Sequence, residues 1–145
     1  MTEAMTNSRL LNWRATDGLL PLGGAQGSVE RTFRQGDIPS VRRCAKDFGT
    51  RLGMRSVRLS DFVLAVSEAA ACTVAGGPCT ARIRLWTTGA RVYCEARGDS
   101  LSHRGPGRQD EAETLRRRLL HRLCDYASVQ AGPDGVTVLA SLAVS

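Results

Sequence analysis

One segment, Leu59–Gly76, constrains the fold of this chain more than any other part of the sequence. Its mostly apolar positions recur at i, i+3, i+4, i+7, i+11 and i+14, which is the spacing of one buried helix face. These positions are Leu59, Phe62, Val63, Val66, Ala70 and Thr73. Ser60 stands where an N-cap residue belongs, and the run Gly76-Gly77-Pro78 stops the pattern. We therefore expect a helix over residues 60–75.

The composition is that of one ordinary globular domain with an excess of basic residues. The chain has 145 residues, of which 42% are hydrophobic and 23% are charged. No apolar run is as long as a membrane span, and no signal-peptide core is present, so we expect a cytoplasmic protein with no membrane partner. The net charge of +6 suits an acidic partner. The arginines are scattered and aromatic residues make up only 5%, which disfavours nucleic acid as the partner.

The cysteines do not form a metal-binding pattern. There are five of them, and no C-x-x-C pair occurs. They are Cys44, Cys72, Cys79, Cys94 and Cys124. We therefore predict no metal site built from cysteines and expect buried, reduced thiols that pack as small apolar side chains.

The order of periodic segments predicts an α+β domain over residues 29–145, preceded by a loosely ordered tail over residues 1–28. Alternating segments predict strands at 29–34, 80–86, 92–97, 126–130 and 136–142, and helical patterns cover 39–52, 60–75 and 110–124. We expect a two-layer sandwich in which the helices cover one face of a mixed β-sheet.

The segment LAVSEAAACTVAG, residues 64–76, resembles the N-box helix of the histidine-kinase-like (Bergerat-fold, HATPase) ATPases. The resemblance is to the small branch of bacterial anti-sigma factors and serine kinases, whose motif reads roughly L-x-L-A-V-S-E-A-x-x-N-A-x-x-H. Glu68 matches the motif Glu, whereas Cys72 replaces the Asn and Gly76 replaces the His. The expected element order agrees with this fold over residues 29–142.

The resemblance implies a chemistry for these positions. Glu68 would be the general base of a kinase, with a solvated helix-face carboxylate as the alternative. The family's Asn gives an oxygen to the Mg²⁺ that bridges the ATP phosphates, and Cys72 is a poor substitute because Mg²⁺ prefers oxygen ligands. Cys72 would otherwise be a small core residue.

Two further motifs match by position but lack the residues that contact nucleotide. The family's adenine-binding motif, V-x-V-x-D-x-G, falls on VYCEARGDS, with Gly98 at the Asp position and Asp99 one place later. A bulge at Gly98 would bring Asp99 to the pocket, and otherwise Asp99 is an exposed turn residue. The glycine-rich phosphate motif falls on residues 114–125, where Thr114 and Arg116 replace the glycines. ATP and Mg²⁺ would therefore bind weakly or not at all.

The resemblance also implies a protein partner. In the family, an Arg on the first helix contacts the sigma factor and its antagonist, and Arg43 falls near that position beside Arg42. We expect an anti-sigma-type regulator, not an enzyme, that binds a sigma factor or an anti-anti-sigma (STAS-type) protein and that would form a homodimer. The alternatives are a solvated helix face at Arg42 and Arg43, and an active ATP-dependent serine/threonine kinase that phosphorylates the anti-anti-sigma partner.

Overall fold

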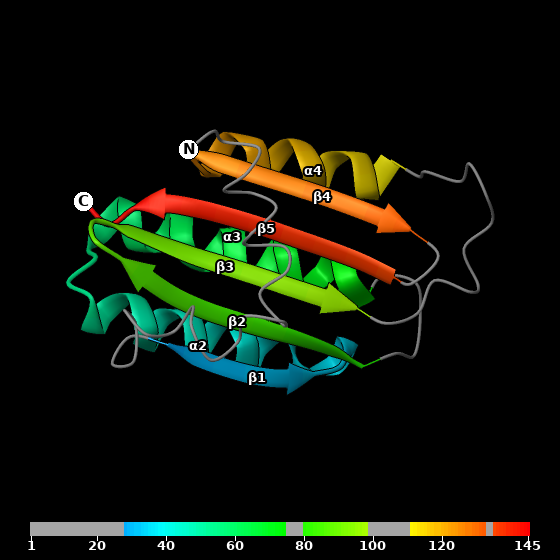
Figure 1. Cartoon of the computed structure of the whole chain (residues 1–145), viewed down its shortest axis with the longest axis horizontal. Coiled ribbons are helices and arrows are strands. Elements are labelled where there is room, and N and C mark those ends of the chain that lie inside the picture. Colours follow the sequence, from blue (N-terminus) through cyan, green and yellow to red (C-terminus); the bar gives the residue numbers. More distant parts are fainter. Residues whose placement is uncertain (1–27, 75–79, 99–110, 133–134) are drawn as a thin grey trace.

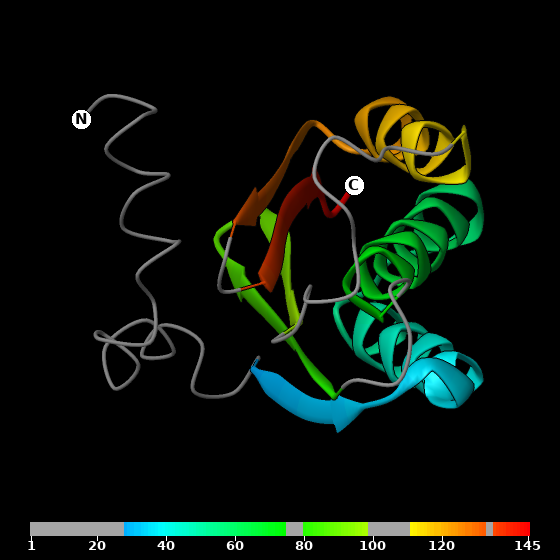
Figure 2. The same cartoon turned by 90° about the vertical axis from the view of Figure 1, so that its right-hand side faces the viewer.

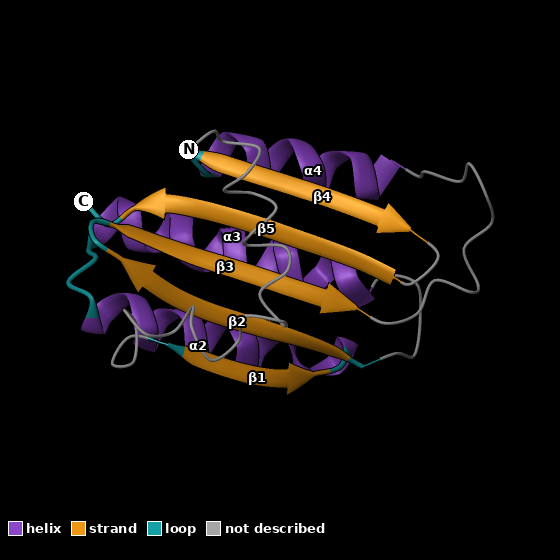
Figure 3. Ribbon diagram, viewed as in Figure 1, coloured by secondary structure: helices purple, strands orange, loops and turns teal. Residues whose placement is uncertain are grey.

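The computed structural model describes residues 28–74, 80–98, 111–132 and 135–145. The elements follow in the order expected from the sequence (Figures 1 and 3). They are β1 (Val29–Phe33), a short 3-10 helix η2 (Gln35–Asp37), α2 (Ile38–Arg51), α3 (Ser56–Val74), β2 (Ala81–Thr88), β3 (Arg91–Gly98), α4 (Glu111–Leu123), β4 (Tyr126–Gly132) and β5 (Gly135–Ala143). The expected N-terminal tail lies outside the described residues, apart from Ser28. Gly76, Cys79 and Asp99 also lie outside them.

The five described strands form one sheet in the order β1-β2-β3-β5-β4, and every neighbouring pair is antiparallel. The prediction of a mixed sheet is therefore wrong. Strands β2 and β3 form one hairpin, and β4 and β5 form another. Helix α4 carries the chain from β3 to β4, which run in the same direction, but β5 lies between them in the sheet (Figure 1). The parallel strands are thus never neighbours.

The helices α2, α3 and α4 all lie on one face of the sheet (Figure 2). This confirms an α+β architecture with a helical layer packed on a sheet. Among the described residues, no helix combines the length and apolar character needed to cross a membrane.

Helix α3 occupies the centre of the helical layer. Phe62, Val66 and Ala70 of the predicted apolar face are fully buried, as are Ala65 and Ala69 beside them. The sheet meets this face with alternate residues of its central strands, and those residues belong to the same apolar cluster: Ala81, Ile83, Leu85, Val92, Cys94, Ala96, Val136, Val138, Ala140 and Leu142. The apolar residues that repeat every two positions in the strands and about every 3.6 positions in α3 thus form one core.

The start of α3 differs from the prediction. The helix begins at Ser56, so Ser60 is an exposed residue of its second turn and not its N-cap. Gly53, with a φ of 89°, turns the chain between α2 and α3. The two helices then approach closely. A Cβ atom added at Gly49 of α2 would lie only 2.7 Å from Cδ1 of Leu59 in α3.

Phe62→Ala tests the central packing of α3. Because the ring is fully buried, its loss should lower the free energy of unfolding by about 3–5 kcal/mol. Urea denaturation followed by circular dichroism measures this change. Val57→Ala is the control, since Val57 lies on the same helix with 72% of its surface exposed, and a loss of similar size there would contradict the assigned faces.

Candidate functional site

Glu68 lies on the side of α3 that faces α4. Its Oε1 is 3.7 Å from Nε of Arg116, and both side chains are partly exposed. The pairing of Arg116 with Glu68 could not be read from either helix alone. The ion pair places a cation beside the carboxylate that the resemblance assigns as a general base. Its own contribution to stability is small, because water screens partly exposed charges.

Cys72 is buried in the apolar core, where its thiol does not face solvent. Cys72, which the resemblance aligns with the family's metal-binding Asn, therefore lies inside the fold. The thiols of Cys94 and Cys124 are buried as well. This burial raises the pKa of Cys94 well above the ordinary 9.0 and that of Cys124 to about 12. Both thiols are therefore neutral near pH 7.

Gly98 is the last residue of β3, and it touches the last turn of α3. A side chain built at Gly98 would overlap the carbonyl oxygen of Thr73. Thr73 is itself buried, and its hydroxyl donates a hydrogen bond to the carbonyl of Ala70 at 2.7 Å. An Asp at position 98, as in the adenine-binding motif, would therefore require α3 and β3 to move apart. Asp99 lies outside the described residues.

The segment aligned with the glycine-rich phosphate motif, residues 114–125, contributes to the packing of the fold. Leu120 is fully buried and Leu123 packs against the core. Asp125 accepts a hydrogen bond from the backbone N–H of Ala143 at 2.8 Å and lies 3.5 Å from Arg91. These residues attach α4 and the start of β4 to the sheet.

The described residues do not fit ATP and Mg²⁺ in the manner of the family. Cys72 is enclosed, Gly98 leaves no room for a carboxylate, and Glu68 is paired with Arg116. Among the residues with described side chains, no three His, Cys, Asp or Glu side chains gather as a metal site would require. Among the described motif positions, Cys72 and Gly98 therefore supply neither an adenine acceptor nor an oxygen ligand for Mg²⁺, and we derive no phosphoryl-transfer step from them.

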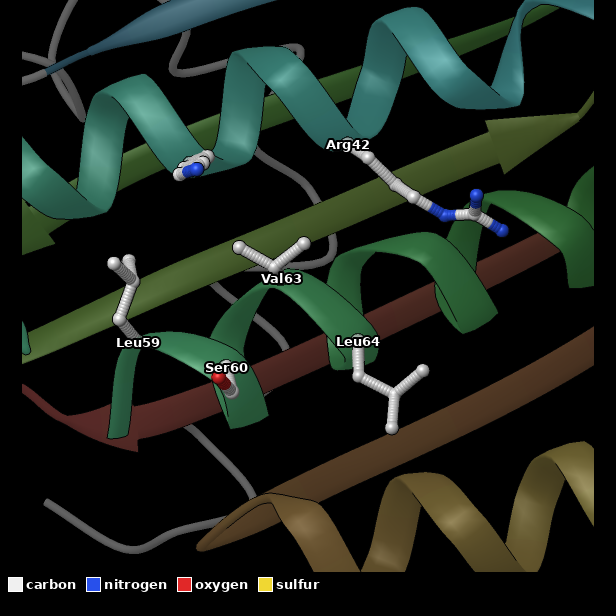
Figure 4. Close-up of a pocket in the computed structure, with 6 residues that line it drawn as sticks. Arg42, Leu59, Ser60, Val63 and Leu64 are labelled. Carbon is white, nitrogen blue, oxygen red and sulfur yellow. The ribbon is translucent and has the colours of Figure 1, made fainter. Parts of the chain in front are cut away.

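A different surface feature lies on the outer side of the helical layer, between α2 and α3. It is a groove with a volume of about 310 Å³ (Figure 4). It is lined by Arg42, Lys46, Leu59, Ser60, Val63 and Leu64. We refer to these six residues as the α2–α3 groove.

The side chains of Arg42 and Arg43, the two candidate partner-binding residues of α2, diverge. Arg42 reaches over α3, where its Nε donates a hydrogen bond to Oγ of buried Ser67 at 3.0 Å (Figure 4). Arg43 stays on α2, where Nη2 donates to Oγ of Ser40 at 3.1 Å. Arg42 is therefore part of the groove wall, whereas Arg43 remains exposed on the neighbouring surface of the helix.

The groove combines apolar and cationic groups. Leu59 and Val63 are partly buried against the core, and Leu64 keeps 40% of its surface exposed. Arg42 and Lys46 supply positive charge from α2. Such a surface can bind an apolar side chain flanked by carboxylates. The signal for it in the sequence was Leu64, a large apolar residue that lies off the buried stripe.

A second surface pocket, with a larger volume of about 760 Å³, lies along α4. Its lining residues are Thr114, Leu115, Arg117, Arg118, Leu119, His121 and Arg122. Leu115 is exposed there, so α4 offers a second basic surface that any binding experiment must distinguish from the groove.

Neither a protein-family model nor a curated protein matches this sequence. Its function must therefore be inferred from the groove, from the motif positions and from the fold that holds them.

Gly98→Ala tests the close contact between β3 and α3. The added methyl group would overlap the Thr73 carbonyl, so we expect a loss of about 1–3 kcal/mol in the free energy of unfolding, as for an overpacked core. Gly132→Ala is the matched control, because nothing lies within 4 Å of a side chain added at that strand position. Urea denaturation of both variants measures the difference. Equal stabilities would show that β3 and α3 are not in contact at Gly98.

Proposed function

We propose that this chain is an anti-sigma-type regulator that acts through protein contacts and has lost the nucleotide site of its scaffold. The observation that carries the proposal is the α2–α3 groove, where Leu64 of α3 is an exposed lining residue and Arg42 and Lys46 of α2 supply positive charge. A groove of this kind suits a partner that presents an apolar side chain among acidic residues.

The Bergerat-type scaffold is supported by the order of the elements and by the helical layer on one face of the sheet. It is also supported by the place of α3, which carries the N-box-like segment and lies against the central strands β3 and β5. The family's partners are sigma factors and STAS-type anti-anti-sigma proteins. We propose a partner from one of these two classes, bound in the cytoplasm.

The alternative, an active serine/threonine kinase, has less support. It requires Glu68 as a base, although this carboxylate lies beside Arg116. It also requires Mg²⁺ to be held without the Asn, at a position where the chain has the buried thiol of Cys72. A regulator that binds its partner without ATP requires neither.

Charge reversal on α2 tests the proposal. We expect Lys46→Glu and Arg43→Glu each to weaken partner binding by at least about 2 kcal/mol, which is about 30-fold, because each reversal places a carboxylate against an acidic surface. Both side chains are exposed, so the melting temperature should change little. The partner is first captured from the native host with the wild-type protein as bait and identified by mass spectrometry. The affinities of the wild-type protein and of each variant for the purified partner are then measured.

Arg122→Glu on α4 is the matched control, because it makes the same charge change on the other basic surface. Its affinity should equal that of the wild-type protein. If Arg122→Glu weakens binding and the two α2 variants do not, the interface is on α4 and the groove is not the site. If neither a sigma factor nor a STAS protein is captured, the anti-sigma proposal fails.

A further inference from the structure

The face of the sheet that points away from the helices, the outer face, carries a set of large side chains at its centre. They come from alternate positions of the three central strands and are Arg84, Trp86, Tyr93, Glu95, Leu139 and Ser141. In the strand register Trp86 lies opposite Tyr93, and Glu95 lies between Arg84 and Leu139. None of these residues belongs to the apolar cluster under the helices.

The centre of the outer face is nevertheless buried. Trp86 is 2% exposed, and Glu95 and Leu139 are each 1% exposed. Trp86 and Leu139 are among the largest fully buried side chains described, yet no described helix or strand lies over this face (Figure 2).

Contacts within the face do not explain this burial. The Trp86 ring stacks on the Tyr93 ring, with the two ring centroids 5.3 Å apart. Cζ of Arg84 lies over the Trp86 ring, 5.9 Å from its centroid. Side chains stand roughly perpendicular to a sheet, so neighbours in the same face cover one another's flanks and leave their outer ends open. Enclosing the outer ends of Trp86 and Leu139 requires a further layer, about 10 Å from the sheet.

We propose that the N-terminal segment, residues 1–27, is this layer and docks its apolar residues on the outer face. The segment leads into β1, which is an edge strand of the sheet. It contains six large aliphatic or aromatic residues in addition to its methionines: Leu10, Leu11, Trp13, Leu19, Leu20 and Leu22. Even as a helix, at about 1.5 Å per residue, it is longer than the width of five strands spaced about 4.8 Å apart.

The other stretches outside the described residues are less suited to this place. Residues 75–79 join α3 to β2, and residues 99–110 join β3 to α4, so each connects the sheet to the helical layer on the opposite face. Residues 133 and 134 are only a two-residue connection from β4 to β5. In this proposal the N-terminal segment forms a third layer of the fold, whereas its composition alone predicts a loosely ordered tail. This inference does not depend on the proposed function.

Fluorescence quenching of Trp86 tests the docking. The chain has two tryptophans, Trp13 and Trp86, so Trp13→Phe leaves Trp86 as the single reporter in the full-length protein. Acrylamide should quench Trp86 weakly in this variant, and dilution should not change the quenching constant. Adding Leu10→Asp with Leu11→Asp should release the segment and raise the quenching constant several-fold. The control pair Thr2→Asp with Asn7→Asp adds the same charge to the segment and should leave the constant unchanged.

Three results would overturn the proposal. In the first, Trp86 of the Trp13→Phe variant is quenched as readily as a free tryptophan amide. In the second, quenching remains weak in the folded Leu10→Asp, Leu11→Asp protein. In the third, quenching rises on dilution as a dimer dissociates, which assigns the outer face to a second copy of the chain. Circular dichroism checks folding, and if the Asp pair unfolds the chain, Leu10→Ala with Leu11→Ala is used and must raise the quenching constant in the same way.

Discussion

Helix α3 lies so close to the sheet that its last turn meets the backbone of β3 at Gly98, and both flanking helices are positioned by it. Phe62, Val66 and Ala70 fill the space over the central strands, and small residues beside them allow the close approach. Helix α2 packs on α3 where Gly49 meets Leu59, and α4 packs along its other side. An amphipathic helix gains most of its stability from such packing, so the helical layer depends on this one contact.

The same packing affects two positions that the resemblance aligns with nucleotide-binding residues. The close contact at Gly98 leaves no space for a side chain at that position, and Cys72 of α3 is buried in the core. The opposite side of α3 is free of this constraint, and there Leu64 and the neighbouring α2 cations form a groove. We therefore infer that the scaffold has been retained to display a protein-binding surface.

Much of the fold follows from local patterns in the sequence. The 3.6-residue period of α3 and the alternation at Ala81, Ile83 and Leu85 predicted both the elements and their buried faces, because burial on one side leaves a periodic trace. Strand neighbours leave no such trace, so the mixed sheet was predicted wrongly. The start of α3 was also missed, since Ser60 has the chemistry of an N-cap although the helix already begins at Ser56.

The candidate site was less predictable, because it depends on contacts between distant elements. The pairing of Glu68 with Arg116 joins α3 to α4, and the bond from Arg42 to Ser67 joins α2 to α3. Neither follows from a pattern within one helix. Trp86 was predicted as part of a strand, but its burial depends on what covers the outer face.

The most direct test of the claim that packing has removed the nucleotide site is a calorimetric titration of the full-length protein with ATP and Mg²⁺. We predict no saturable heat, or an affinity weaker than about 1 mM, which corresponds to a binding free energy smaller in magnitude than about 4 kcal/mol. Cys72→Asn should not restore binding by itself, because Gly98 still meets Thr73. Saturable binding of ATP by the unmodified chain with a micromolar dissociation constant would contradict the claim and would favour the kinase alternative.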